Sequence, residues 1–129
     1  MSVQFNETAL NEGLRNYGLM IWGQERPSIL VWLAYEQNQI RHFVSFEDNP
    51  EYMSMLDGVA TTRGLTLMFP LLDLEDSSRI NVSDIWGDFK DPILDASKRY
   101  KADVILTAKI IQVLPNLWES KWTAYMNPQ

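Results

Sequence analysis

Uninterrupted and alternating apolar runs along the chain predict five strands. The run SILVWLAY at 28–35 is almost wholly apolar and suits a strand buried on both faces. After the polar turn EQNQ, IRHFVSF at 40–46 predicts an antiparallel return strand. Two further strands are predicted by LTLMF at 65–69 and ADVILTAKIIQV at 102–113. The last, LWESKWTAYM at 117–126, alternates apolar and polar side chains, as a strand with one buried face does.

Helix signals separate these strands. Apolar residues at helical spacing predict a first helix over 7–17, ahead of the first strand. A clearer helix spans 50–63, begins with a proline, and is ended by Gly64. A third helix is predicted from about 88 to 100, with Pro92 confined to its first turn.

The order of these elements indicates the fold class. Two strand–helix–strand units lie between two hairpins. This order predicts an α/β domain with a mixed sheet. We expect a two-layer sandwich, with a sheet of about five strands and two to three helices. Residues 1–129 would form one domain, since a chain of this length suits a single core.

Charge and composition narrow the range of partners. The net charge of −6 and the lack of a concentrated basic patch make nucleic-acid binding a poor expectation. No apolar run is long enough to span a membrane. The absence of cysteine excludes disulfides and thiolate chemistry. The amino terminus lacks the basic and apolar regions of a signal peptide.

Three segments together resemble a known family. They are IWGQERPSILVWLA at 21–34, LLDLEDSSRINVSDIWGDF at 71–89 and ASKRYKADVILTAKI at 96–110. They resemble the uncharacterised bacterial envelope family called domain of unknown function 2066 (DUF2066), from whose helix pattern Pro92 departs. The resemblance implies a periplasmic location and a fragment of a longer secreted precursor, and it carries no catalytic residue. The last segment also resembles, at the level of fold, small periplasmic modules such as the amino-terminal domain of TolB.

The acidic stretch at 71–89 raises the question of a metal site. A calcium loop counted from Asp73 would have Ser78 where glycine is needed and Asp84 where glutamate is needed. The single His42, without any cysteine, cannot build an ordinary zinc site. We therefore expect no metal.

The same stretch could instead hold paired catalytic acids or helix caps. Capping accounts for two of its carboxylates, Asp84 and Asp88, and for Asp91 just after it. It does not reach Asp73, Glu75 and Asp76, which lie in a loop well before the helix that we predict from about 88. No nucleophile elbow, histidine-paired nucleophile or glycine-rich phosphate loop is present, so we expect a non-enzyme without a cofactor.

Chain direction suggests where a binding site would lie. If the strand at 65–69 runs opposite to the one at 28–35, the acidic loop emerges at the end where the first strand begins. That would bring Trp22 and Arg26 close to the acidic loop, and we expect Arg26 to bind one of its carboxylates. Trp22 and Trp86 either anchor their connectors or contact a partner. The candidate binding residues are Trp22, Arg26, Asp73, Glu75, Asp76 and Trp86.

Two functions stay open on the sequence. The first is a non-catalytic interaction module of the bacterial cell envelope, whose partner is a protein or a neighbouring domain of the same precursor. The second is a ligand-binding or hydrolytic domain that uses Asp73, Glu75 and Asp76 on a saccharide or another polar ligand. Carboxylates that converge on a concave pocket would favour the second. Carboxylates engaged in backbone and arginine contacts would favour the first.

Overall fold

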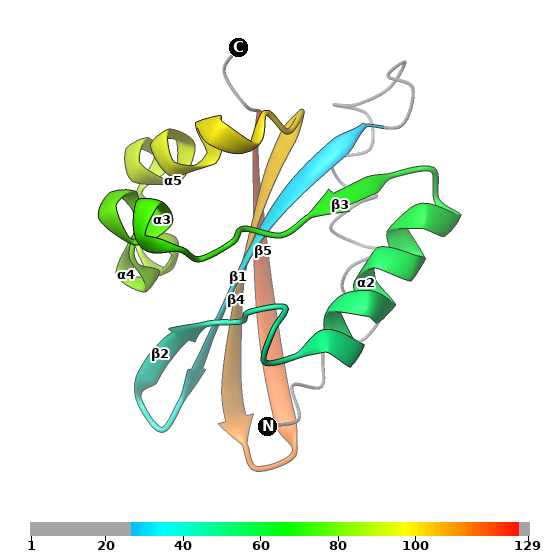
Figure 1. Cartoon of the computed structure of the whole chain (residues 1–129). Helices are drawn as coiled ribbons and strands as arrows, with labels where there is room; N and C mark the ends of the chain where they lie inside the picture. The colour runs from blue at the N-terminus through cyan, green and yellow to red at the C-terminus, as the bar shows by residue number, and fades with distance from the viewer. Residues whose placement is uncertain (1–26, 127–129) are drawn as a thin grey trace.

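The computed structural model describes residues 27–126, so the helix predicted over 7–17 lies outside the described residues. Figure 1 shows a central sheet with helices on either side. The strands are β1 (Ser28–Gln37), β2 (Ile40–Phe43), β3 (Thr66–Met68), β4 (Val104–Leu114) and β5 (Leu117–Met126). The helices are α2 (Pro50–Thr62), α3 (Leu74–Arg79), α4 (Val82–Trp86) and α5 (Lys90–Ser97), followed by the short 3-10 helix η2 (Lys98–Tyr100).

The α/β class and the mixed five-stranded sheet are confirmed. The strands run in the order β2–β1–β4–β5, and β3 pairs with β1 on the edge that β2 also uses. β1 is parallel to β3 and β4, whereas β2 and β5 are antiparallel to their neighbours. The starts of β1 and β4 are tied together by Asp103, which accepts hydrogen bonds from the backbone and hydroxyl of Ser28.

The predicted direction of the third strand is wrong, because β3 runs parallel to β1. β2 pairs only with the second half of β1, from Ala34 onward, whereas β3 pairs with its first residues, Ser28 to Leu30. The chain must therefore travel back along β1 before β3 begins, and α2 covers that distance (Figure 1). The acidic loop leaves β3 in the direction of β1, not at the end where β1 starts.

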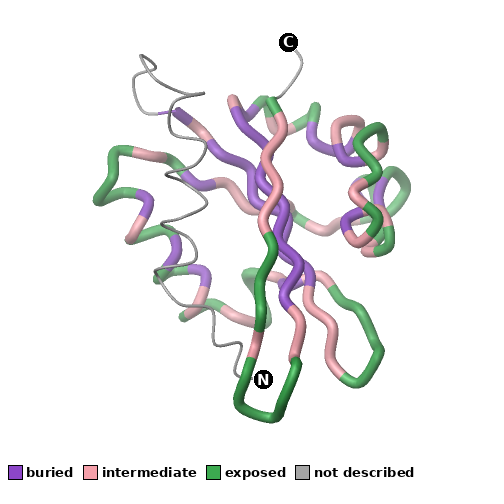
Figure 2. The backbone as a smooth tube through the Cα atoms, turned by 180° about the vertical axis from the view of Figure 1, so that it is seen from behind, coloured by how far each residue is buried: buried purple, intermediate pink, exposed green. Residues whose placement is uncertain are grey.

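Helices cover both faces of the sheet, so the structure has three layers where two were expected. On one face, Ile29, Val31 and Leu33 of β1 pack against α2. On the other, Leu30 and Trp32 pack against α4, α5 and Ile80, the residue that follows α3. Successive residues of a strand point to opposite faces, which explains why β1 lacks any polar–apolar alternation. The fully buried stretch of β1 and β4 forms the centre of the molecule (Figure 2).

The clearest sequence signals form the elements they predict. Pro50 stands at the first position of α2, where its missing N–H costs nothing. Gly64 ends that helix with a φ of 75°, in the left-handed region that glycine adopts without strain. The β1–β2 hairpin turns through Asn38 and Gln39, which both have positive φ angles, as a tight hairpin turn requires.

The region between β3 and β4 contains more helix than predicted. The single helix expected from about 88 to 100 is α5 with η2, and Pro92 lies in its first turn as expected. α3 and α4 precede it and have only six and five residues. α2 has 13 residues, and in the described part of the chain no helix is long and apolar enough to cross a membrane.

Candidate functional site

Asp73 begins a helix that the sequence did not predict. One of its carboxylate oxygens accepts a hydrogen bond from the backbone N–H of Asp76 at 3.0 Å, the usual contact of an N-cap residue. Glu75 and Asp76 then lie in the first turn of α3, near the positive end of its dipole. The expectation that helix capping does not reach these three acids is therefore wrong, because Asp73 caps α3 and Glu75 and Asp76 lie in its first turn.

Arg99 brings the three carboxylates of the acidic loop together. Its Nη1 atom lies 2.8 Å from Asp73 Oδ1, 3.3 Å from Asp76 Oδ1 and 3.4 Å from Glu75 Oε2. Arg99 thus makes the contact that we expected of Arg26. Trp22 and Arg26 lie outside the described residues, so their place beside the acidic loop is untested, but the strand direction from which it was predicted is wrong.

Asp76 is the buried member of this group, with 1% of its surface exposed. Its Oδ2 atom accepts hydrogen bonds from the hydroxyl of Tyr100 at 2.5 Å and from the backbone N–H of Leu72 at 2.9 Å. The Tyr100 oxygen in turn accepts one from the backbone N–H of Leu71 at 2.8 Å. We call Asp73, Glu75, Asp76, Arg99 and Tyr100 the acidic-loop cluster. Through these bonds the cluster holds the backbone that leads into α3.

The cluster also offsets backbone strain. Leu72 has a φ of 55°, a left-handed conformation that costs energy in a residue with a side chain. Its N–H bond to Asp76 and the neighbouring bond from Leu71 to Tyr100 hold the loop in this conformation. Side chains of α3 and η2 therefore hold this turn in a strained conformation, and such strain persists only where the surrounding structure fixes the backbone.

Hydrogen bonds and burial fix the protonation states of Asp73, Arg99 and Tyr100 at neutral pH. The hydrogen bond from Arg99, with help from the backbone N–H of Asp76, lowers the pKa of Asp73. The same bond raises the pKa of Arg99 above its usual value. Burial, and then the hydrogen bond to Asp76, raise the pKa of Tyr100 to about 12. Tyr100 therefore stays protonated and serves as a donor, whereas Asp73 stays charged.

The later carboxylates of the stretch have separate roles. Asn81 caps α4, and Asp84 returns a hydrogen bond to the Asn81 backbone N–H, which completes a capping box. The capping role predicted for Asp84 is confirmed. Asp88 instead pairs with Lys109 of β4 at 2.8 Å, so it links the helical layer to the sheet. Its second carboxylate oxygen is buried and has no hydrogen-bond partner among the described residues.

Trp86 is not part of the acidic-loop cluster and lies at the end of α4. It is half-buried against the core on the α3–α5 face. The guanidinium of Arg41, from β2, lies 4.7 Å from the centre of its ring, within the range of a cation–π contact. These contacts match the anchoring interpretation of Trp86, since they join α4 to the edge strand β2.

An apolar groove lies beside the acidic-loop cluster. It has a volume of about 520 Å³ and is lined by Ser45, Phe46, Glu47, Phe69, Pro70 and Leu71. The rings of Phe46 and Phe69 are 5.9 Å apart, yet Phe46 is 46% exposed and Leu71 68% exposed. Leu71 is the residue whose N–H bonds to Tyr100, so the cluster holds one wall of this groove.

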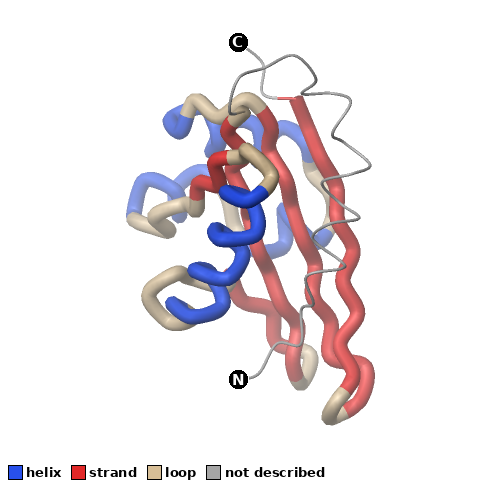
Figure 3. The backbone as a smooth tube through the Cα atoms, turned by 90° about the vertical axis from the view of Figure 1, so that its right-hand side faces the viewer, coloured by secondary structure: helices blue, strands red, loops and turns tan. Residues whose placement is uncertain are grey.

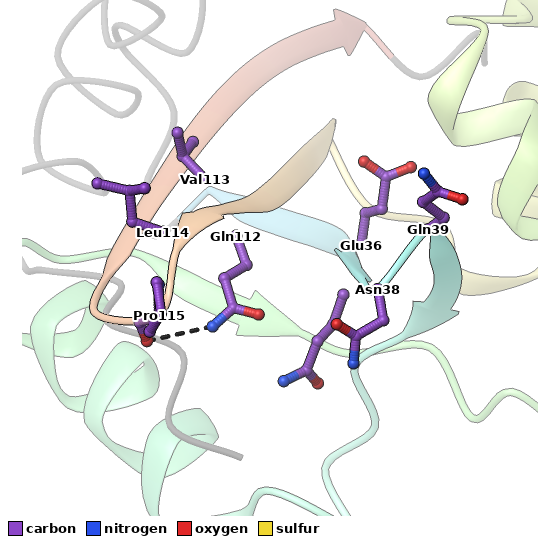
Figure 4. Close-up of a pocket in the computed structure, with 8 residues that line it drawn as sticks. Glu36, Asn38, Gln39, Gln112, Val113, Leu114 and Pro115 are labelled. Atoms are coloured by element: carbon purple, nitrogen blue, oxygen red, sulfur yellow. Dashed lines mark hydrogen bonds between the residues drawn. The ribbon is translucent and has the colours of Figure 1, made fainter.

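A second groove lies between the two hairpin tips and is lined mainly by polar residues. β4 continues past the end of β1, so the β4–β5 hairpin extends beyond the β1–β2 turn (Figure 3). Between them lies a space of about 560 Å³ whose lining includes Glu36, Asn38, Gln39 and Gln112. Figure 4 shows Glu36 and Gln39 on one side of the β1–β2 turn and Asn38 on the other, and Gln112 donates to the Pro115 carbonyl. These polar groups do not converge on one point, as groups that orient a ligand would.

Among the described residues, the carboxylates and His42 do not form a metal-binding group. Across residues 27–126, no group of three histidine, aspartate or glutamate side chains is arranged to hold a metal ion. His42 lies in β2, as predicted, and its ring centre is 5.4 Å from that of Tyr35 on β1.

Arg99 and Tyr100 are the members of the site that sequence reasoning missed. They lie at the end of the helix predicted from about 88 to 100, in the turn that the structure forms as η2. The side chains of Arg99 and Tyr100 nevertheless reach back over more than twenty residues to Asp73 and Asp76. The available signal was the arginine–tyrosine pair itself, which supplies donors that buried carboxylates need.

Comparison with known proteins does not add a family to this description. No protein-family model matches the chain, and neither a curated protein nor a solved structure matches it. The resemblance to DUF2066 and the fold-level likeness to the TolB amino-terminal domain therefore stay expectations from the sequence.

Proposed function

We propose that this chain is a non-catalytic interaction module of the bacterial cell envelope, and that it binds a protein through the apolar groove. The observation that carries this proposal is the engagement of all three acidic-loop carboxylates by Arg99. Catalytic or sugar-binding acids need oxygens that face a ligand, whereas these three contact Arg99, and Asp76 also accepts a hydrogen bond from Tyr100.

The apolar groove supports the choice of a protein as the partner. Phe46 and Leu71 expose large apolar surfaces next to each other, and aromatic residues are enriched where proteins bind one another. Glu47 in the lining and Asp48 beside it give the groove an acidic rim. A partner segment with an apolar side chain flanked by basic residues would fit this chemistry.

The envelope location rests on the resemblance to DUF2066 alone. A neighbouring domain of the same precursor fits the groove as well as a separate protein, since both offer an apolar segment. The saccharide alternative has less support. The three carboxylates that would bind the sugar contact Arg99, and Asp76 also contacts Tyr100, so they do not converge on a concave pocket.

A capture experiment with matched variants tests the proposal. The purified chain is immobilised, exposed to envelope extract, and compared with the Phe46→Ser variant. Phe89→Ser is the control, because Phe89 is 55% exposed but lies at the start of α5, outside the groove. We expect Phe46→Ser to lose the captured proteins and Phe89→Ser to keep them, with both variants folded by circular dichroism. Equal capture by all three proteins would refute the groove as the binding site.

The saccharide alternative has its own readout. Envelope polysaccharide fragments are titrated into the wild type and into Asp73→Asn, with binding followed by tryptophan fluorescence. The proposal expects no binding to either protein. Saturable binding that Asp73→Asn abolishes would instead support the ligand-binding function.

A further inference from the structure

The end of the β4–β5 hairpin is apolar and exposed. The segment VLPNLW at 113–118 forms the two strand ends and the turn between them, and all of it is apolar or aromatic except Asn116. Leu114 is 59% exposed, and Val113 and Leu117 are exposed as well (Figure 2). Turns that face water are usually built from polar residues and glycine. We call residues 113–118 the hairpin tip.

Apolar side chains lie on both faces of the hairpin tip. Leu114 pairs with Leu117 across the turn, so these two side chains lie on the same face. Trp118 follows Leu117 and therefore points to the other face, where it packs against the α2 side of the core and stays partly exposed. A flat protein surface would contact one face of such a hairpin, whereas the interface of a lipid bilayer surrounds whatever enters it.

The backbone of the turn has few polar groups left to satisfy. Pro115 has no N–H, and its carbonyl accepts a hydrogen bond from the side chain of Gln112 at 3.1 Å (Figure 4). Backbone groups that leave water without a partner are costly in an apolar phase. The bond from Gln112 lowers this cost at the point that extends furthest from the sheet.

We propose that the hairpin tip inserts into the interfacial region of a lipid bilayer. A strand rises by about 3.3 Å per residue, so the turn lies about 7 Å beyond Trp118, a depth that matches the ~5–10 Å reached by interfacial segments. Trp118 then lies at the level of the headgroups, where tryptophan is enriched in membrane proteins. Glu119 and Lys121, the exposed charged residues next along β5, stay in water.

The surroundings of the hairpin tip limit the contact to this one hairpin. β4 continues past the end of β1, so the β1–β2 turn with its polar Asn38 and Gln39 ends short of the tip (Figure 3). The net charge of −6 disfavours attraction to anionic headgroups, so apolar insertion must carry the binding. The inference goes beyond the proposed function and does not involve the apolar groove, so either can fail alone.

Vesicle binding tests the insertion. The full chain is mixed with phosphatidylcholine vesicles and sedimented, and the partition constant is measured for each variant. We expect Leu114→Ser and Leu117→Ser each to lower it by about fivefold or more, because each removes apolar surface from the membrane. Leu74→Ser, which changes an exposed leucine on α3, should leave it unchanged. Phe46→Ser should also keep vesicle binding, which separates the hairpin tip from the groove.

A single fluorescent label tests which part of the chain enters the membrane. The chain has no cysteine, so Asn116→Cys accepts one environment-sensitive dye at the turn, and Ser54→Cys places the same dye on the exposed side of α2. With phosphatidylcholine vesicles, the label at 116 should shift to the blue and be quenched by lipids brominated in their acyl chains, and the label at 54 should not change.

Three results would overturn the inference. The first is a wild type that does not partition into phosphatidylcholine vesicles, or that partitions only into anionic phosphatidylglycerol vesicles, since charge and not insertion would then carry the contact. The second is equal partition of the wild type and both hairpin-tip variants. The third is loss of captured envelope proteins by Leu114→Ser and Leu117→Ser without any vesicle binding, which would make the hairpin tip a protein contact.

Discussion

At the scale of single residues, the acidic loop depends on two side chains from η2. Arg99 contacts all three carboxylates, and Tyr100 connects Asp76 to the backbone at Leu71. The members of the cluster differ in burial, since Asp76 is 1% exposed and the side chain of Glu75 is 49% exposed. Their contributions to stability should differ in the same order, because burial makes a lost hydrogen-bond partner costly.

The first prediction compares these two acids. Asp76→Ala leaves the Leu72 N–H and the Tyr100 hydroxyl without their acceptor, so it should lower the free energy of unfolding by about 3 kcal/mol. Glu75→Ala removes only exposed ion pairs and should barely change stability. Urea unfolding of both variants measures the difference. Equal losses would show that the burial of Asp76 carries no special weight.

The second prediction concerns pH. Arg99 lowers the pKa of Asp73 in the folded chain, so the charged carboxylate stabilises the fold above the ordinary pKa of about 3.9. That contribution is lost as the pH falls through the lowered pKa. Asp73→Asn keeps a capping side chain and removes the charge. Urea unfolding should find the variant less stable than the wild type at neutral pH, with the gap closing below about pH 4. A gap independent of pH would refute the role of the charge.

At the scale of elements, the sequence predicted those with strong and extended patterns. The unbroken apolar run of β1 and the alternation of β5 left little choice of strand type. α3 and α4 were missed because five or six residues are too few to show a helical period. Their caps, Asp73 and Asn81, are local signals that polar loops also contain, so capping residues alone could not define them.

The third prediction compares a central strand with the edge strand. Trp32 of β1 is fully buried and donates a hydrogen bond to the Ser97 hydroxyl at 2.9 Å. Trp122 of β5 is half-buried on the other face. Trp32→Ala should cost about 3–5 kcal/mol, and Trp122→Ala about 1–3 kcal/mol because less surface leaves water. Thermal and urea unfolding test the order. A Trp122→Ala variant as stable as the wild type would show that β5 contributes little to the fold.

At the scale of the whole molecule, the sheet determines which segments meet. The class and the five strands followed from the sequence, but the third layer and the direction of β3 did not. Both depend on which part of β1 each neighbouring strand pairs with, and apolar periodicity carries no information on pairing. The partner of the acidic loop was missed for a related reason. Arg99 reaches Asp73 only because α5 packs beside α3, and no local sequence pattern predicts that contact.

The account as a whole holds that the acidic-loop cluster is a structural device that fixes the loop before α3 and with it one wall of the apolar groove. Amide hydrogen exchange at Leu71 and Leu72 tests this claim most directly, because their N–H groups bond to Tyr100 and Asp76. Both amides should be protected in the wild type. Tyr100→Phe should remove the protection of Leu71 while the amides of β1 keep theirs. Fast exchange at Leu71 in the wild type, or protection unchanged in the variant, would contradict the account.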